Sequence, residues 1–324
     1  MKKIIAMMLA AIMMLSLAAC GDKTPDNPDD EKKTLIVGTS ADYAPYEFMY
    51  PDANGNMVYG GIDISVAAYV AEHMGLEMQV ENIGFDFLLT DMAKGDCDIV
   101  IAAMEVDDER LLTADFSNPY YTDLPAMIVV KAENADQYKT LADFAGKSVG
   151  AQTATTKEDI VVNDMPGANL VSLQVATDLI NQLVNNKLDA IVLDGAVAMQ
   201  YTEANKDLVV AAASDELGEA APYCIAVAKG DPKGLLEGIN AAIADLVAEG
   251  KMEQFIADAD ALVNYAKRQS NRFAFFLQNL TRYPSAFRCF PPFPLPRFPP
   301  FLLLPTLFLL PAGKRFPWQG LHRY

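Results

Sequence analysis

Arg110 is the one arginine in residues 1–267, where every other fixed positive charge is a lysine. It ends the acidic stretch AAMEVDDER. Lysine carries a flexible, strongly hydrated point charge, whereas arginine presents a planar fork of donors that matches the two oxygens of a carboxylate. A single arginine among acids therefore predicts a carboxylate-binding role. An ion pair with the neighbouring Asp107 or Glu109 is the alternative hypothesis.

The other residue types that could do chemistry are sparse. We see no G-x-S-x-G motif, catalytic histidine arrangement or metal-ligand spacing, so we expect no catalytic residue, no metal and no cofactor. The formal net charge of −18 argues against nucleic acid as a partner. His73 lies where the pattern predicts the end of a helix, so we expect it at the surface. Cys97 and Cys224 lie in apolar, strand-like runs, so a disulfide and two buried thiols both remain open.

Residues 1–20 have the pattern of an export signal. A lysine pair precedes an apolar run over residues 4–17 that is too short to span a bilayer of about 30 Å. The run leads to LAAC, which resembles the lipobox of bacterial lipoproteins and predicts lipidation of Cys20. Ordinary cleavage after Ala19 is the alternative. Residues 21–33 are polar, charged and proline-containing, which predicts a flexible linker.

The C-terminal stretch has a different composition. No Asp or Glu occurs after Asp260, and prolines crowd residues 284–317. Prolines at this density exclude a continuous helix or central strand. Residues 265–324 are therefore predicted to be a Pro-, Phe- and Arg-rich tail that is disordered or translated out of frame. A genuine wall- or membrane-associating segment is the alternative.

Between these ends, short apolar runs alternate with amphipathic segments. Strands are predicted at TLIVG, LEMQVEN, CDIVIAA and DAIVLD, and helices at IDISVAAYVAEHMG, FDFLLTDMAKG, ATDLINQLVNNK and GAVAMQYTEA. This alternation predicts an α/β fold with parallel sheets that are covered on both faces. Ligands in such folds bind beyond the carboxyl ends of the strands. The loops after LIVG, DIVIA, KSVGA and DAIVL are therefore expected to carry the site.

Those loops fall in the blocks VGTSADYAPYEF, FDFLLTDMAKGDCDIVIAAMEVDDER, LADFAGKSVGAQTATT and LVNNKLDAIVLDGAVA. Over about residues 34–260 the chain resembles the extracellular solute-binding proteins of polar amino-acid ABC importers, the bacterial solute-binding protein family 3. The resemblance implies a two-lobed periplasmic-binding-protein (Venus-flytrap, type II) fold. One lobe would comprise residues 34–125 plus 224–264, and the other residues 126–223. Two extended crossings, near LPAMIVVK and PYCIAVAK, would form the hinge.

The resemblance also implies how a zwitterion is held. Arg110 matches the arginine that clamps the α-carboxylate of the ligand. Asp194 matches the acceptor of the α-ammonium group. An N-cap on the helix that follows is an alternative role for Asp194, and both roles could hold at once.

Five further positions match the family's ligand contacts. Tyr43 and Phe85 match the aromatic pair that sandwiches the ligand side chain, with ordinary core packing as the alternative. Thr155 matches a hydroxyl that joins the carboxylate at a helix N-terminus, where free N–H groups favour anions. Ser40 and Thr156 match specificity positions.

Two positions of the predicted site depart from the family. The family usually carries Gly or Ser at Ala103 and Thr or Ser at Glu105. A buried carboxylate without a partner is costly, so Glu105 is expected to turn outward or to accept from a cationic ligand, such as a basic amino acid or an amine. The loop AQTATT also lacks a glycine that is common there, so its backbone is expected to approach the carboxylate differently.

The function implied by the resemblance is that of a lipid-anchored, extracytoplasmic receptor. As a monomer, it would bind a polar amino acid and deliver it to the permease and ATPase subunits of an ABC importer. An exported cyclohexadienyl or arogenate dehydratase on the same fold is the enzyme alternative, with Glu105 as its acid. A sensory ligand-binding module is the third hypothesis.

Overall fold

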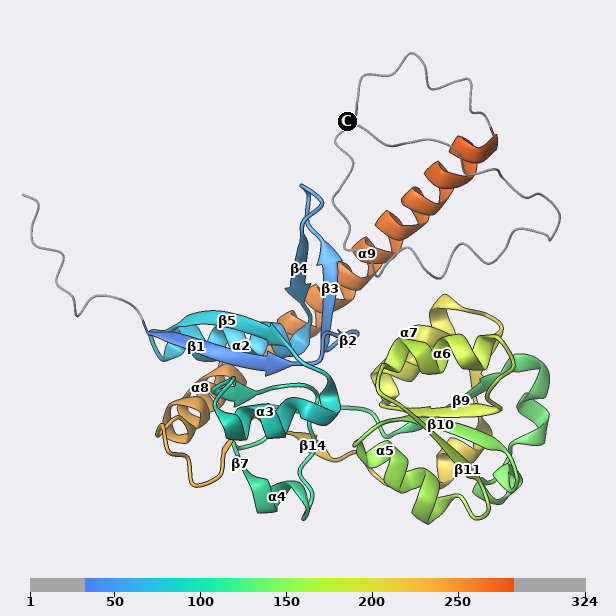
Figure 1. Ribbon diagram of the computed structural model, residues 1–324, viewed down its shortest axis with the longest axis horizontal. Coiled ribbons are helices and arrows are strands. Elements are labelled where there is room, and N and C mark those ends of the chain that lie inside the picture. Colours follow the sequence, from blue (N-terminus) through green and yellow to red (C-terminus); the bar gives the residue numbers. More distant parts are fainter. Residues whose placement is uncertain (1–32, 283–324) are drawn as a thin grey trace, which may run out of the picture.

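The computed structural model describes residues 33–282, which form two lobes side by side, each built around its own five-stranded sheet (Figure 1). The predicted α/β class with two sheet-containing lobes is confirmed. The predicted export signal, Cys20, almost all of the predicted linker and residues 283–324 of the predicted tail lie outside the described residues.

The first lobe is built on a mixed sheet with the strand order β5-β1-β6-β15-β7. β1 runs parallel to β5 and β6, whereas β15 runs antiparallel to both β6 and β7. This lobe is discontinuous in sequence because β15 returns to it after the second lobe is complete. The strands are β1 (Thr34–Thr39), β5 (Glu77–Asn82), β6 (Ile99–Val100), β7 (Ala114–Phe116) and β15 (Ala226–Ala228).

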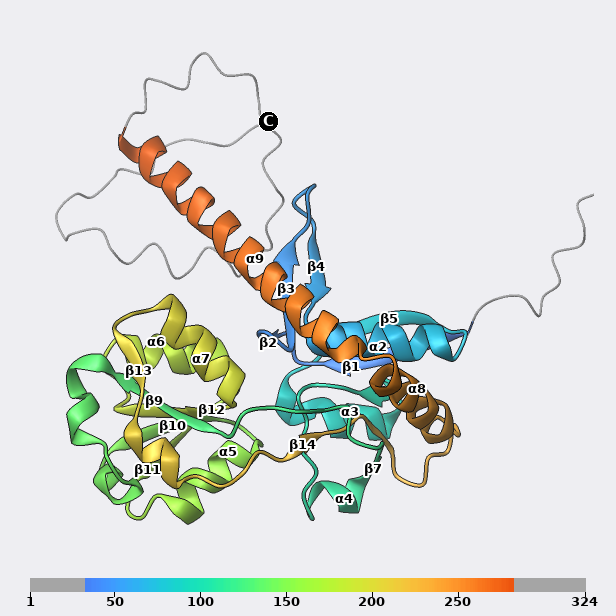
Figure 2. The ribbon, with the colours of Figure 1, turned by 180° about the vertical axis from the view of Figure 1, so that it is seen from behind.

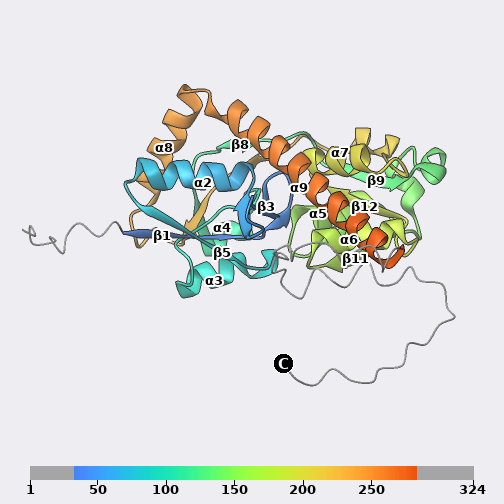
Figure 3. The same ribbon diagram turned by 90° about the horizontal axis from the view of Figure 1, so that it is seen from above.

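Helices cover both faces of the first sheet. α2 and α8 lie on one side of β1 and α3 lies on the other (Figure 3). The amphipathic run that predicted α2 buries Val66 and Val70, and at its surface end His73 contacts Asp245 at 2.9 Å. The remaining elements of the lobe are β2 (Asp42–Tyr43), β3 (Glu47–Pro51), β4 (Met57–Gly60), α2 (Ile62–His73), α3 (Leu88–Lys94), α4 (Arg110–Thr113) and α8 (Leu236–Ala248).

The second lobe repeats this architecture with the strand order β11-β10-β12-β9-β13. β10 runs parallel to β11 and β12, and β9 runs antiparallel to β12 and β13. Its elements are β9 (Met127–Lys131), β10 (Ser148–Gln152), α5 (Thr156–Asp159), β11 (Asn169–Leu173), α6 (Ala176–Val184), β12 (Ala190–Leu193), α7 (Gly195–Ala204) and β13 (Leu208–Val210). The loops after β10 and β12 face the first lobe.

Two extended segments cross between the lobes side by side (Figure 2). They pair as β8 (Tyr121–Thr122) and β14 (Pro222–Tyr223), antiparallel to each other. α7 starts very close to the first crossing: a Cβ added at Gly195 would lie 2.4 Å from the Cβ of Leu124. A side chain at this position would push the second lobe away from the hinge.

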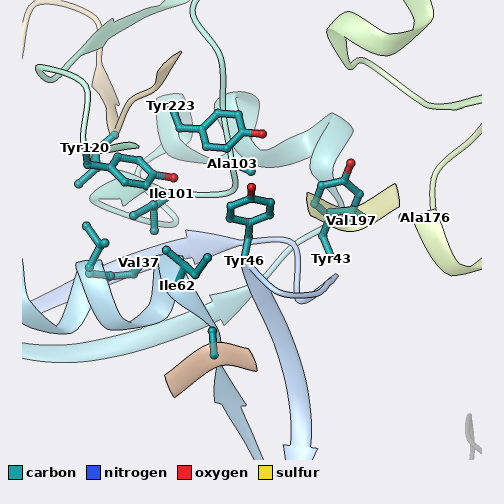
Figure 4. Close-up of a cluster of buried hydrophobic side chains, with 14 of the residues drawn as sticks. Val37, Tyr43, Tyr46, Ile62, Ile101, Ala103, Tyr120, Ala176, Val197 and Tyr223 are labelled. Atoms are coloured by element: carbon teal, nitrogen blue, oxygen red, sulfur yellow. The ribbon is translucent and has the colours of Figure 1, made fainter. Parts of the chain in front are cut away.

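Tyrosines fill the junction between the hinge and the first lobe (Figure 4). Tyr46 packs edge-on against Tyr223, with 5.3 Å between ring centroids, and stacks on Tyr43 at 6.3 Å. Tyr120 lies 6.4 Å from Tyr223. Aromatic pairs at such separations contribute about 0.5–1.5 kcal/mol beyond their buried area. Because Tyr223 belongs to β14, this cluster fixes the hinge to the core of the first lobe.

The last described element is α9 (Lys251–Arg282), a long helix that packs on α2, α8 and β3 and then extends beyond the first lobe (Figure 2). Val263 continues its buried face, and Tyr265 meets Tyr50 of β3 edge-on. The helix therefore passes residue 264, where the sequence patterns place the end of the lobe. Residues 265–282 are helical, because the dense prolines begin only after them.

Cys97 and Cys224 are both buried free thiols, so of the two alternatives the structure shows the unpaired one. Burial raises the pKa of each thiol to about 11, which keeps both protonated and unreactive at neutral pH. Within residues 33–282, no helix is both long and apolar enough to cross a membrane.

Candidate functional site

A narrow pocket lies between the two lobes, and all nine residues singled out from the sequence line it. Six of the nine, between residues 40 and 110, belong to the first lobe, and three, between residues 155 and 194, belong to the second. The space left inside is about 20 Å³, room for about one water molecule. The nine residues are Ser40, Tyr43, Phe85, Ala103, Glu105, Arg110, Thr155, Thr156 and Asp194.

Arg110 spans the cleft with its guanidinium group. Nη1 donates to the carbonyl of Glu105 at 2.6 Å, and Nη2 donates to the carbonyl of Ala154, on the second lobe, at 2.9 Å. Nε lies 3.1 Å from Asp107, so the predicted ion pair is also present. Burial lowers the pKa of Arg110, and the Asp107 carboxylate opposes that effect. The group is 9% exposed and remains a cation, with two N–H groups left for a ligand carboxylate.

Asp194 occupies the N-cap position of α7, but its side chain does not cap the helix. Asp123, from the hinge segment, takes that role and accepts from the backbone N–H of Ala196 at 3.0 Å. The Asp194 carboxylate is thereby free to point into the pocket. There Oδ2 accepts from the hydroxyl of Tyr43, on the first lobe, at 2.7 Å.

Lys157 is a pocket residue that the sequence patterns do not single out. It is 5% exposed, and its Nζ lies 2.5 Å from Asp194 and 3.0 Å from Glu105. Burial by itself would lower the pKa of Lys157, but the two carboxylates outweigh burial and raise it. The buried ammonium of Lys157 therefore pairs with Asp194, the carboxylate that the resemblance assigns to the ammonium group of a ligand.

Glu105 takes neither of the two arrangements expected from the sequence. It does not turn outward, and a protein side chain rather than a ligand supplies its cation. The carboxylate accepts from the Thr156 hydroxyl and from Lys157, both on the second lobe. The unusual acid at this position and Lys157 compensate each other across the cleft.

The aromatic and hydroxyl residues are arranged around these charges. The Arg110 guanidinium carbon lies 5.5 Å from the centroid of Phe85, a cation–π contact. Thr155 donates its hydroxyl to the carbonyl of Gln152 at 2.6 Å. Ser40 donates to Asp42 at 3.3 Å. Because the Thr155 hydroxyl donates to a backbone carbonyl, it could donate to a ligand anion only after breaking that hydrogen bond.

Two alanines in the loops around the pocket adopt left-handed backbone. Ala103 has φ 45° and Ala154 has φ 63°, values that favour glycine. This conformation points the Ala103 N–H at Asp63, at 2.6 Å, and the Ala154 carbonyl at Arg110. The strand predicted at CDIVIAA accordingly shortens to Ile99–Val100, because the chain turns into the cleft after it.

Glu47, which lines the pocket, and Asp63 form a buried pair of acids on the first lobe. Asp63 accepts from Ala103 N–H at 2.6 Å and from the Tyr120 hydroxyl at 2.8 Å. Burial raises the pKa of Asp63 to about 6. Burial and the neighbouring Asp63 also raise the pKa of Glu47, whose Oε2 is buried without a hydrogen-bond partner. The pair is therefore a proton-binding element of the folded state.

We expect Asp63→Asn to flatten the pH dependence of stability. An unfolded aspartic acid has a pKa of about 3.9, so the folded state binds this proton more tightly. The stabilisation is complete below about pH 4 and is lost as the pH rises through about 6. A shift of about two pKa units corresponds to about 3 kcal/mol. Between pH 4 and pH 7, the free energy of unfolding in urea should therefore fall by about 3 kcal/mol more in the parent than in Asp63→Asn.

The control for this measurement is Glu253→Gln, which removes an exposed carboxylate of α9. It should keep the pH dependence of the parent. Retention of the parental pH dependence by Asp63→Asn as well would contradict the role given to Asp63.

A second, more open space adjoins the pocket on the far side of Arg110 and Phe85. Its lining is strongly acidic and includes five carboxylates, those of Asp86, Asp107, Glu109, Glu158 and Asp159. Within residues 33–282, no three His, Cys, Asp or Glu side chains gather as metal ligands do. The five carboxylates create a negative potential at the cleft.

Six of the pocket residues carry no sequence signal strong enough to find them in advance. Lys157 has a weak one: a lysine in the first turn of a helix opposes the helix dipole, which indicates a specific carboxylate partner nearby. Of the other five, three have apolar side chains, and the two polar ones are Glu47 and Gln152. The six are Glu47, Ala102, Gln152, Lys157, Val192 and Leu193.

Comparison with known proteins gives consistent matches. The model of the bacterial extracellular solute-binding proteins, family 3, matches residues 35–258. The arginine-binding extracellular protein ArtP of Bacillus subtilis (strain 168) is 32% identical over 256 residues, which cover 78% of this chain and 96% of that protein.

Two solved structures are similar across both lobes. The amino acid ABC transporter substrate-binding protein AbpA from Streptococcus pneumoniae Canada MDR_19A, bound to L-arginine, has a TM-score of 0.65 and 31% identity, covering 70% of this chain and 94% of that one. The ancestral amino acid-binding protein AncCDT-1, a precursor of cyclohexadienyl dehydratase, has a TM-score of 0.62 and 30% identity, covering 69% and 94%.

Proposed function

We propose that this chain, which belongs to family 3 of the bacterial extracellular solute-binding proteins, binds a basic amino acid such as L-arginine and presents it to the permease and ATPase of an ABC importer. The observation that carries the proposal is that the buried guanidinium of Arg110 and the buried carboxylate of Asp194, from opposite lobes, line the same pocket. Arg110 would bind the α-carboxylate of the ligand, and Asp194 its α-ammonium group.

The charge of the cleft supports a basic ligand. Glu105 and Lys157 compensate each other, and Arg110 is compensated by Asp107, which leaves the charge of Asp194 in excess. The five carboxylates around the adjoining space add to it. A zwitterion without a side-chain charge leaves this excess in place, whereas a ligand with net charge +1 cancels it. ArtP, which is named as an arginine-binding protein, and AbpA, whose structure holds L-arginine, agree with this preference.

The sharpest test compares L-arginine with L-citrulline, which has nearly the same size and shape but a neutral side chain. We expect calorimetric titration of the purified chain to show at least about tenfold tighter binding of L-arginine, corresponding to ~1.4 kcal/mol. L-Lysine and L-histidine extend the series. Equal affinity for L-citrulline would contradict the basic preference, and a chain that binds no amino acid at all would contradict the function itself.

The likeness to AncCDT-1 keeps an enzyme as the second candidate. A dehydratase needs a group that donates a proton to the departing hydroxyl. Glu105 is held as an acceptor by an ammonium and a hydroxyl, an arrangement that favours a structural pair over an acid catalyst. Incubation with prephenate or arogenate decides between them: product formation that disappears in Glu105→Gln would establish the enzyme.

We also propose that a lipid on Cys20 holds the chain at the membrane, on the strength of the LAAC sequence. The proposal treats the chain as a monomer. One acyl chain gives marginal membrane binding, whereas two or more give stable anchoring. We expect Cys20→Ala to move the protein from the membrane fraction to the soluble extracytoplasmic fraction. A variant that remains in the membrane fraction to the same extent as the parent would contradict the anchor.

A further inference from the structure

The ammonium group of Lys157 lies where the two lobes meet. Glu105 belongs to the first lobe, and Lys157 and Asp194 belong to the second. The three side chains are buried or nearly so, with Lys157 5% and Asp194 7% exposed. Asp194 also accepts a hydrogen bond from Tyr43 of the first lobe. The contacts therefore cross the cleft twice, from Glu105 to Lys157 and from Asp194 to Tyr43.

The lobes are closed on each other in this arrangement. Besides the Lys157 contacts, Arg110 reaches the Ala154 carbonyl, and Gln174 donates to Asp86 at 2.8 Å across the cleft. The pocket retains room for about one water molecule. Lys157 therefore occupies the position beside Asp194, and its contact with Glu105 joins the two lobes in the closed arrangement.

We propose that Lys157 is a tethered occupant of the ammonium subsite: it holds Asp194 in the unliganded protein, and a ligand has to displace it from that carboxylate. The proposal deepens the proposed function and rests on it for the role of Asp194. It makes Lys157 a specificity-determining residue, since a ligand without an ammonium group has nothing to offer Asp194 in exchange.

Glu105 explains how the displaced ammonium remains compensated. Lys157 already lies 3.0 Å from Glu105, so it can release Asp194 and keep its other carboxylate. The exchange leaves no buried charge unpaired, which would otherwise cost several kcal/mol. Glu105 and Lys157 thus act as one unit.

The alternative role for a buried lysine here is to bind a second carboxylate, as an acidic ligand would require. The charges do not favour it. Lys157 is shared by two carboxylates and Arg110 is paired with Asp107, so no positive charge is left over for another anion. The titration below nevertheless separates the two roles, because they predict opposite effects of removing the ammonium.

Lys157→Met tests the proposal, since methionine keeps an unbranched apolar stem and removes the charge. L-Arginine should bind the variant at least about tenfold more tightly, because no internal competitor reduces the binding-competent fraction. Glu105→Thr combined with Lys157→Met removes both members of the pair and restores the parental net charge. It should also bind L-arginine more tightly, which would exclude an effect of the added negative charge alone.

A second measurement does not depend on the ligand. Spin labels on Glu77→Cys and Lys187→Cys, exposed positions on the first and second lobes, report the distance between the lobes. Without ligand, the otherwise parental protein should show the short, closed distance, and Lys157→Met should show a longer one, because Glu105 and Asp194 then repel each other. Lys206→Met, an exposed lysine of the second lobe, is the control and should match the parent in both experiments.

The outcomes are distinct. Weaker binding of L-arginine by Lys157→Met, or binding of L-glutamate that disappears with the ammonium, would overturn the tethered occupant. So would an unliganded variant as closed as the parent. If the parent binds no amino acid but the interlobe distance responds to Lys157→Met as expected, the proposed function fails while the closing role of Lys157 stands.

Discussion

Asp194→Asn is expected to weaken L-arginine binding by between about 30-fold and a few thousand-fold. The carboxylate is 7% exposed and is the acceptor to which the ligand ammonium is assigned. Removing one partner of a desolvated charge pair costs about 2–5 kcal/mol, because the other charge stays buried without compensation. The measurement is the dissociation constant of L-arginine by calorimetric titration.

The fold should tolerate this substitution. Asp123, not Asp194, caps α7, and Lys157 retains Glu105 when Asp194 loses its charge. The melting temperature of the unliganded protein should therefore change little compared with the loss of affinity. Asp207→Asn removes an exposed carboxylate of the same lobe and should leave the affinity unchanged. Normal binding by Asp194→Asn would place the ligand ammonium elsewhere.

The elements of the fold were predictable because each is encoded locally. The apolar run 34–38 becomes β1, and the amphipathic run 62–75 becomes α2, close to the predicted limits. The helix α9 was predicted less well, because its end depends on where the dense prolines begin and not on the change in charge that starts after Asp260.

The composition of the site was also predictable, whereas its electrostatics were not. All nine residues identified from the sequence line the pocket, although their roles toward a ligand stay predictions. Lys157 was missed because a lysine on a short helix is ordinarily solvated. Its charge is compensated by Asp194 of its own lobe and by Glu105 of the other lobe, and no local pattern reports contacts between residues so far apart in the sequence.

The same limit applies to Glu105. Taken alone, a carboxylate beside a predicted anion site has two plausible arrangements, outward or toward a cationic ligand. The structure shows a third, in which the chain supplies the cation itself. A departure from a family pattern can therefore be compensated by a residue of the other lobe, and such a pair is visible only after the tertiary contacts are known.

Arg110→Lys is expected to fold and to bind L-arginine at least about tenfold more weakly, corresponding to ~1.4 kcal/mol. Three separate acceptors surround the guanidinium, namely Asp107 and the carbonyls of Glu105 and Ala154. A single ammonium keeps the charge but cannot reach all three and still present two parallel donors to a carboxylate. Loss of the fork should therefore affect ligand binding more than the charge balance of the cleft.

Because Arg110 also pairs with Asp107, stability and affinity have to be measured separately. Asp107→Asn removes the ion pair and leaves the fork, so it should lower the melting temperature at least as much as Arg110→Lys but reduce affinity less. Arg268→Lys, at an exposed position of α9, should alter neither quantity. If Arg110→Lys binds L-arginine as well as the parent and only its melting temperature falls, then Arg110 stabilises the closed cleft without holding the ligand carboxylate.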